Sequence, residues 1–509
     1  MNYVPIRLKR FAESNPKLAG AGGLVLCFLV LVAVYTRLSL TGSKNSDDAA
    51  LVLEARDILR GNILLHGWTL PLDTFYTTDI PLYVVGALFA TDHATPMYVI
   101  PAAEYALIVV LCIATVWKRV PAVSKAISVL FIISIIVFPA LTFGPPTEGG
   151  GDHVIVLIFL LAAFWLLSSD RFVAAAIVLA LADIGDPLAV WIGNLAIGAV
   201  GLRMLTIERR RAIRMLTVVA AAGIIWKLAD LLIRHFGGFQ ISAGLAKDEF
   251  VPLSKLSANL YQFVASVLVI FDANFFGRQV ESFATMLVLV HFALLLFMVW
   301  AVVRLIRRSL AGEWEIMTEL LWMTMAADAA AFILSAHPGD LASARYLVPL
   351  LIYGTLLVAL AWSALGIERK YFQYLLPVIL LSYAVGFTIR TMAPIAANPT
   401  DAVEYIESKG LKEGYGSYWS AGILTVMSNG DLHVRQVTPG PGGVLVPYRW
   451  LSAAQWYDAP DARFAVFDSR EFIPDISRAV MMWGQPQEIK TIDGYHIAIW
   501  GEPIHVPQQ

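Results

Sequence analysis

Apolar runs long enough to cross a bilayer recur along most of this chain. The first is 19–40, the second is 97–117 and the last is 371–387. Since about 20 apolar residues span the hydrocarbon core as a helix, this repetition predicts a bundle of membrane-spanning helices. The composition agrees, because 58% of the residues are hydrophobic, only 15% are charged and the mean hydropathy is +0.68. The bilayer is therefore the solvent for most of the chain.

Basic residues cluster in alternate turns between these runs. Lys118, Arg209, Arg304 and Arg369 each belong to such a turn, and lysines and arginines also precede the first run. Because cytoplasmic turns carry the excess of Lys and Arg, the pattern predicts about eleven crossings, a cytoplasmic N-terminus and a C-terminus on the far side. We expect a mostly α, polytopic protein of the bacterial inner (plasma) membrane.

The charge and the cysteine content argue against several other classes of protein. The formal net charge of -2 argues against a nucleic-acid partner, which would require a basic surplus. Cys27 and Cys112 both fall inside apolar runs, where neither is placed for a disulfide or a metal site. The sequence has no HExxH motif, CxxC pair or Walker motif. No cofactor is expected, although a divalent metal at paired acids stays open.

Two parts of the chain are predicted to lie outside the membrane. Residues 41–96 form a long first outer loop, in which 48–60 has helical spacing and 80–90 is apolar but too short to cross. We expect both to be helices resting on the membrane surface. From residue 398 the composition changes to Gly, Pro and strand-like alternation.

The predicted division is therefore a transmembrane domain, 1–397, and a small α+β extracytoplasmic (periplasmic) domain, 398–509. Roughly 110 residues suffice for such a domain with its own core.

Two apolar runs do not fit a simple crossing. Asp183 and Asp186 interrupt 172–202, which we expect to be two short helices meeting at the outer surface, because acids and proline are costly in lipid. The two acids are then interpreted as helix caps. The run 260–271 is short, and the alternation of the other helices requires that it does not cross or that it returns to the same side.

Asp47 and Asp48 are the leading catalytic candidates. They follow the first predicted crossing, which would deliver them to the outer surface, where a carboxylate could act as a general base. The alternative is structural, because Ser and Asp are favoured at helix N-termini, so Ser46 and Asp47 could cap the helix that begins there. The sequence pattern does not indicate whether Asp47 or Asp48 would be the base.

Other polar residues are expected on the same outer side. Cations near a carboxylate base would suit transfer from a phosphate-linked donor, since they could hold the phosphate. The candidate cations are Arg345, Lys247, Lys255 and Arg278. Candidates for acceptor binding or a secondary role are Asp152, His153, Glu148 and His337.

Each of these residues also has a structural interpretation. Arg345 could anchor its helix at the membrane interface by snorkelling. Lys247 and Lys255 could belong to a solvated loop, and Asp152 with His153 could simply begin a helix.

The order of segments resembles that of the GT-C superfamily of integral-membrane glycosyltransferases. The resemblance rests on a basic N-terminus, one helix, a long outer loop opening with Asp47-Asp48, further helices and an outer C-terminal domain. In addition, Arg345-Tyr346 resembles the Arg-Tyr start of a late helix in these enzymes. Similar layouts occur in protein O-mannosyltransferases, aminoarabinose transferases of lipid A and mycobacterial arabinosyltransferases. The resemblance covers 1–387 as an architecture.

The resemblance implies a reaction. In that superfamily an acid of the first outer loop is the catalytic base, which here is Asp47 or Asp48, and Arg345 with Tyr346 would lie near the donor phosphate. The donor would be a polyprenyl-phosphate sugar and the cell-envelope acceptor a glycolipid, polysaccharide or protein, with inversion of the anomeric centre. The mannosyl and aminoarabinose enzymes have Asp-Glu where this chain has Asp-Asp, so the resemblance leaves the hexosyl or pentosyl donor open.

Two alternatives belong to other classes. A transporter or flippase of a lipid-linked sugar would bind the substrate without chemistry and would carry ionisable groups within its helices. Asp230 and Asp328 are such groups, but the sequence shows no internal repeat. An inactive partner of a polysaccharide synthesis complex would keep the architecture and not need the acids.

Overall fold

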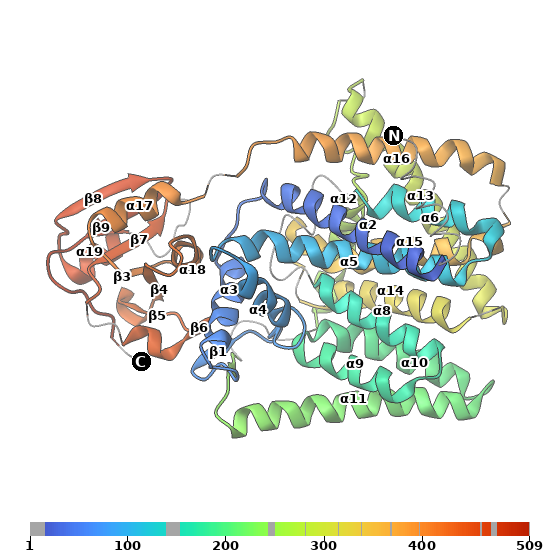
Figure 1. Cartoon of the computed structure of the whole chain (residues 1–509), viewed down its shortest axis with the longest axis horizontal. Helices are drawn as coiled ribbons and strands as arrows, with labels where there is room; N and C mark the ends of the chain where they lie inside the picture. The colour runs from blue at the N-terminus through green and yellow to red at the C-terminus, as the bar shows by residue number, and fades with distance from the viewer. Residues whose placement is uncertain are drawn as a thin grey trace.

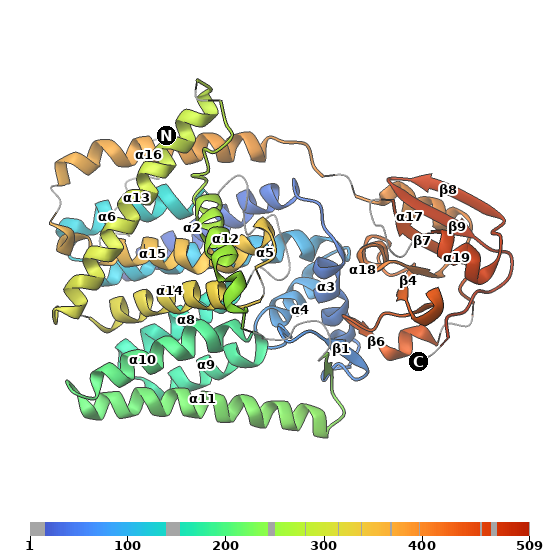
Figure 2. The ribbon, with the colours of Figure 1, turned by 180° about the vertical axis from the view of Figure 1, so that it is seen from behind.

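The chain forms a helical bundle with a smaller α/β domain beyond one end (Figure 1). The computed structural model describes residues 16–138, 153–242, 250–279, 281–313, 315–336, 338–366, 369–396, 398–458, 461–469 and 476–507. The long helices run roughly side by side, with α11 (Arg209–His235) and α16 (Arg369–Thr391) along opposite edges (Figures 1 and 2). The predicted mostly α architecture is confirmed.

Apolar helices build the bundle. Besides α11 and α16 they are α2 (Pro16–Ser39), α5 (Thr95–Arg119), α6 (Ala122–Ile136), α8 (Val154–Ser168), α9 (Phe172–Gly185), α10 (Leu195–Met204), α12 (Leu256–Ile270), α13 (Phe283–Leu310), α14 (Ile316–Leu334) and α15 (Val348–Leu360). In the described ranges, eight helices, counted with any adjoining 3-10 turn, are long and apolar enough to cross a membrane. Shorter apolar helices pack among them, so the count of about eleven crossings stays a prediction.

Burial separates central from peripheral helices. Of the most apolar 18-residue windows, that of α15 with its preceding 3-10 turn is 72% buried and that of α5 is 67% buried, whereas that of α11 is 11% buried. A helix that is apolar all round and little buried is suited to face lipid. We therefore infer that α5 and α15 form the centre of the bundle and α11 its lipid-facing edge.

The predicted interruption of 172–202 is present. Helix α9 ends at Gly185, and a π-helical segment η1 (Ala189–Asn194) leads into α10. Asp183 and Asp186 are each 1% exposed, so neither is a solvent-facing cap. The run 260–271 falls in α12, which with the 3-10 turn η2 (Leu253–Lys255) is longer than the sequence pattern indicated.

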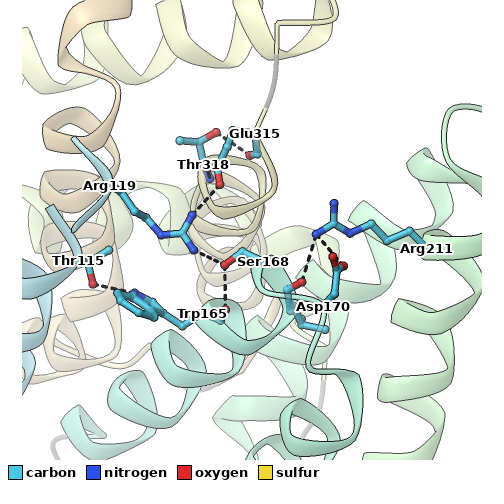
Figure 3. A network of polar contacts seen from close by, with 9 residues as sticks. Thr115, Arg119, Trp165, Ser168, Asp170, Arg211, Glu315 and Thr318 are labelled. Carbon is cyan, nitrogen blue, oxygen red and sulfur yellow. Dashed lines mark hydrogen bonds and ion pairs between the residues drawn. The ribbon is translucent and has the colours of Figure 1, made fainter. Parts of the chain in front are cut away.

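Ion pairs join helix ends on the side of the bundle away from the C-terminal domain. Figure 3 shows Arg119, at the end of α5, donating to Glu315 at 2.9 Å and also to Ser168 of α8. In the same view Arg211 of α11 pairs with Asp170 at 3.0 Å. Charged side chains at this end fit the interpretation that it is the cytoplasmic side.

An outer layer separates the bundle from the C-terminal domain. It contains α3 (Ser46–Leu59) and α4 (Ile80–Phe89), which match the two predicted surface helices. Next to them a three-stranded sheet joins three distant segments in the order β2 (Gln240–Ile241), β1 (Trp68–Leu70) and β6 (Ser452–Ala453). Main-chain hydrogen bonds therefore link the first outer loop, the segment after α11 and the C-terminal domain.

A six-stranded mixed sheet forms the centre of the C-terminal domain. Its strand order is β5 (Leu445–Pro447), β4 (His433–Pro439), β3 (Glu413–Gly416), β7 (Phe464–Asp468), β9 (Tyr495–Ile499) and β8 (Glu488–Ile492). Alternate residues of β7 enter two cores, Phe464 and Val466 on one face and Ala465 and Phe467 on the other. The domain also has α17 (Thr400–Ser408), α18 (Tyr418–Met427), α19 (Ile476–Trp483) and two 3-10 turns, η5 (Pro441–Gly443) and η6 (Ala454–Tyr457).

Candidate functional site

A cavity of about 1000 Å³ lies where the bundle, the outer layer and the C-terminal domain meet. Its apolar lining comes mainly from the segment around η1 and from α14, and includes Leu188, Trp191, Leu195, Ala327, Ala330, Ala331, Phe332 and Leu334. Its polar lining includes Asp47, Asp73, His153, Asp186, Asp328, Ser335, Arg345, Tyr346, Tyr418, Thr438 and Tyr448. One cavity therefore offers both an apolar wall and a set of charged groups.

The two neighbouring acids of the first outer loop have different surroundings. The cap of α3 is Asn45, whose side chain accepts from the main chain of the first turn, while Asp48 accepts the Asn45 N–H at 2.9 Å. Asp48 is fully buried and lies 3.5 Å from Lys44 Nζ. Asp47 lines the cavity instead. Successive helical residues point about 100° apart, which accounts for the separation.

Asp47 accepts a hydrogen bond from the hydroxyl of Tyr418 in the C-terminal domain. Burial raises the pKa of Asp47 above its ordinary value, while the Tyr418 hydrogen bond and the charge of Arg345 oppose that rise. Both opposing groups favour the ionised carboxylate. The arrangement can therefore hold a carboxylate that accepts a proton from a group bound in the cavity.

Arg345 reaches the same cavity from η3 (Leu341–Leu347), the 3-10 turn that precedes α15. The side chain of Asp340 caps this turn by accepting from the N–H of Ala342 at 2.9 Å. The Arg345 guanidinium lies 5.2 Å from the ring centroid of Tyr346 and donates to its hydroxyl at 3.3 Å. A guanidinium held in this way presents several donors suited to a phosphate.

A group of buried acids and one histidine lies next to Arg345 and Tyr346, since the rings of His153 and Tyr346 are 5.4 Å apart. His153, the residue before α8, pairs through Nδ1 with Asp186 at 2.6 Å. Burial lowers the pKa of His153, but the charge of Asp186 and its hydrogen bond outweigh this, and the pKa is raised. Burial raises the pKa of Asp73 to about 6 and that of Asp79 to about 7.

Aromatic side chains of the C-terminal domain form the wall opposite the bundle. The ring of Tyr418 lies edge-to-face with Trp419 at 4.8 Å and with Tyr448 at 5.5 Å. Trp450 lines the cavity as well, and Trp419 is 46% exposed. Exposed aromatic rings on a cavity wall can stack on the apolar face of a ring-shaped ligand.

The structure brings only some of the predicted site residues together. Asp47, His153, Arg345 and Tyr346 line the cavity, and Asp48 lies behind it. Lys255 and Arg278 are exposed elsewhere, the latter donating to the carbonyl of Asn274 at 2.9 Å. Glu148, Asp152, Lys247 and His337 lie outside the described residues. Within the described ranges no group of three or more His, Cys, Asp or Glu could hold a metal ion.

Two residues of the polar lining that the sequence did not single out are Asp73 and Tyr418. Asp73 follows Pro71-Leu72 in the first outer loop, and this break between apolar stretches was the available signal. Asp186 was interpreted as a cap. Tyr418 could not be singled out, because nothing in the local sequence indicates contact with a residue 371 positions away.

The bundle, the long segment between α2 and α5 and the C-terminal domain together form a multi-pass membrane protein with the GT-C fold. Among solved structures, the chain is similar to ArnT from Cupriavidus metallidurans in the apo state, with 12% identity, a TM-score of 0.56 and coverage of 94% of this chain and 98% of ArnT.

A second solved structure is less similar. It is the oligosaccharyltransferase of Archaeoglobus fulgidus tethered to an acceptor peptide, with 12% identity, a TM-score of 0.46 and coverage of 91% of this chain and 71% of that one. The similarity to ArnT supports the fold. No protein-family model matches the sequence, and neither does any curated protein.

Proposed function

We propose that this protein is a membrane glycosyltransferase that transfers a sugar from a polyprenyl-phosphate donor to an extracytoplasmic acceptor of the cell envelope. The observation that carries the proposal is the joint presence of Asp47 and Arg345 in one cavity with an apolar wall. A lipid-linked donor requires these three features, namely a base, a phosphate-binding cation and an apolar surface. The GT-C fold shared with ArnT adds support at the level of architecture.

Asp47 is the proposed general base, and Asp48 is a structural residue. As the acceptor oxygen attacks the anomeric carbon, its proton passes to the Asp47 carboxylate and the bond from that carbon to the phosphate oxygen breaks. The electron pair leaves with the lipid phosphate, and the anomeric centre inverts. Arg345, supported by Tyr346, stabilises the charge on the departing phosphate.

The donor lipid is proposed to lie against the wall formed by α14 and the segment around η1. Ala327, Ala330 and Ala331 give this wall a row of small side chains on α14, and Trp191 and Leu195 add larger apolar side chains from the segment around η1. Leu195 is 54% exposed and Leu334 is 43% exposed, so the wall continues toward the lipid-facing surface. An isoprenoid chain could therefore enter the cavity sideways from the bilayer.

The first test compares Asp47→Asn with Asp48→Asn in purified protein reconstituted in lipid, using a panel of polyprenyl-phosphate sugars and cell-envelope acceptors. Asp47→Asn should reduce transfer by about 100-fold or more, the usual contribution of a general base. Asp48→Asn should keep transfer in whatever fraction of the protein folds, because Asp48 is fully buried behind the cavity.

Donor binding is the control, since Asp47→Asn should bind the lipid-linked sugar as the wild type does. Transfer that survives Asp47→Asn in folded protein would refute the assignment of the base.

Transport of a lipid-linked sugar is the second candidate, favoured by Asp328. This residue of α14 lines the cavity, is 2% exposed, and one of its carboxylate oxygens has no hydrogen-bond partner in the described part of the chain. Acids buried within membrane helices often mark transport pathways. A transporter should lose translocation in Asp328→Asn and show no transfer in any variant, whereas a glycosyltransferase should show transfer that depends on Asp47.

A further inference from the structure

The C-terminal domain reaches the carboxylate of the proposed base. Tyr418 is the first residue of α18, and its phenolic oxygen donates a hydrogen bond to Asp47 Oδ1. The two residues are 371 positions apart in the chain. The contact therefore exists only because the C-terminal domain folds against the start of α3.

Close packing of α18 on α3 holds this contact in place. The N–H of Gly422, one turn after Tyr418, donates to Ser46 Oγ at 3.2 Å. A Cβ atom at position 422 would lie 3.2 Å from Ser46 Oγ and 3.4 Å from the Cβ of Ala49, so glycine permits this approach. The Tyr418 ring is also held edge-to-face by Trp419 and Tyr448. Neither partner of the hydrogen bond can move far without disturbing this packing.

The other charged and titratable groups around Asp47 come from several elements. Arg345, in η3, and Tyr448, in the segment after β5, both interact electrostatically with Asp47. On its own side of the chain, Lys44 and Asp48 pair with each other. In the described part of the chain, Tyr418 is the one of these groups that donates a hydrogen bond to the Asp47 carboxylate.

We propose that Tyr418 is a positioning residue for the transfer reaction, and that the C-terminal domain through it forms part of the reaction site rather than only a cover. The inference rests on the proposed function. Tyr418 fixes Oδ1 and thereby turns Oδ2 toward the cavity, where it can accept the proton of the acceptor hydroxyl. The same hydrogen bond favours the charged carboxylate in a site from which water is largely removed.

Tyr418→Phe is the matched test, because it removes one oxygen and leaves the ring. A hydrogen bond to a charged group contributes about 1.5 kcal/mol or more, so the acid limb of the pH profile of kcat should move upward by about one pH unit. Below that limb transfer should fall about tenfold, and the loss should shrink at higher pH. Tyr405→Phe is the control, since Tyr405 lies in the same domain and bonds to Glu488, away from the cavity.

A second readout separates this inference from the proposed function. The Asp47 carboxyl band can be identified in pH-difference infrared spectra of the protein in bilayer discs as the band that Asp47→Asn removes. Its titration midpoint should rise in Tyr418→Phe and stay unchanged in Tyr405→Phe, with thermal unfolding confirming that both variants fold. A raised midpoint without transfer by any variant would refute the proposed function and keep the positioning role. Transfer with an unshifted midpoint and pH profile would refute the positioning role alone.

Discussion

Several carboxylates lie close together beside the cavity, where the charge of each affects the pKa of the others. Asp73, Asp79 and Asp186 interact electrostatically with one another and with His153, the one imidazole beside them. Asp79 is 3% exposed, and one of its oxygens has no hydrogen-bond partner in the described ranges. Buried acids of this kind hold their protons more tightly in the folded protein than in the unfolded chain.

The raised pKa values of these buried acids predict that the protein loses stability as the pH rises. The pKa of Asp79 increases from 3.8 to about 7 on folding, so the folded state binds more protons across that interval and stability falls as pH increases through it. The ion pair of His153 with Asp186 changes the stability in the same direction. Because folding raises the pKa of His153, the pair stabilises the folded protein at low pH, and this stabilisation is lost as the pH rises through the raised pKa.

The thermal unfolding midpoint in detergent should therefore decrease between pH 4.5 and 7.5, and the decrease should be smaller in Asp79→Asn. Asp461→Asn changes an exposed acid and should behave as the wild type. An equal pH dependence in Asp79→Asn and wild type would contradict the assignment.

Local pattern could place Asp47 and Asp48 at the start of a helix, but could not decide their roles. The decision depends on Asn45, which takes the cap position, and on Asp48 completing the capping box. With the cap at Ser46 or Asp47, as the sequence alternative had it, Asp48 would not stand at the third helical position, where it completes the capping box. The interpretation that Ser46 or Asp47 is the cap is therefore wrong, although a capped helix does begin here.

At the scale of helices, a polar contact at the end of the bundle away from the C-terminal domain joins α10, α13 and α14. Arg203 of α10 pairs with Glu319 of α14 at 2.6 Å and donates to Ser309 Oγ of α13 at 2.9 Å. Glu319 is 1% exposed. An acid buried so deeply is tolerated because its charge is compensated.

Removing the acid should destabilise the bundle markedly. Glu319→Ala leaves Arg203 without its charged partner, and loss of one member of a buried pair costs about 3 kcal/mol. Glu313→Ala breaks the pair with Arg308, in which the side chain of Glu313 is 60% exposed, and should cost under about 1 kcal/mol. Unfolding of both variants in mixed detergent micelles measures the difference, and equal losses would argue against a structural role for the buried pair.

Element positions were largely predictable, because hydrophobic periodicity is a local property. The surface helices predicted at 48–60 and 80–90 are α3 and α4, and the strand-like alternation predicted after residue 398 corresponds to the strands of the six-stranded sheet. The burial of Asp183 and Asp186 was not predictable, since it depends on how α8 and the first outer loop pack against the interruption after α9. A contact such as that between His153 and Asp186 leaves no pattern in the local sequence.

For the whole molecule, Trp68 lies at the junction of its three parts. The side chain is 1% exposed, its indole N–H donates to Asp57 at 2.7 Å, and its ring meets Trp456 of the C-terminal domain at 4.9 Å. The strand that carries Trp68 pairs with both β2 and β6.

Trp68→Ala should weaken the attachment of the C-terminal domain as well as overall stability. Large-to-small changes of buried aromatics cost about 3–5 kcal/mol. Hydrogen exchange should accelerate at β6, and cleavage by a protease between α16 and α17 should become faster. Trp300→Ala removes a ring that is 45% exposed on α13 and should leave both measurements unchanged. Unaltered exchange at β6 in Trp68→Ala would show that the junction does not depend on this ring.

The pairing of β1 with β6 has a consequence for biosynthesis. The partners Trp68 and Ala453 are separated by most of the polypeptide, so this sheet can close only after the segment that carries Ala453 has been synthesised. Until then the cavity beside Asp47 lacks Tyr418 and the aromatic wall of the C-terminal domain. Under the proposed function, a chain that ends before this domain would be inserted in the bilayer without a complete reaction site.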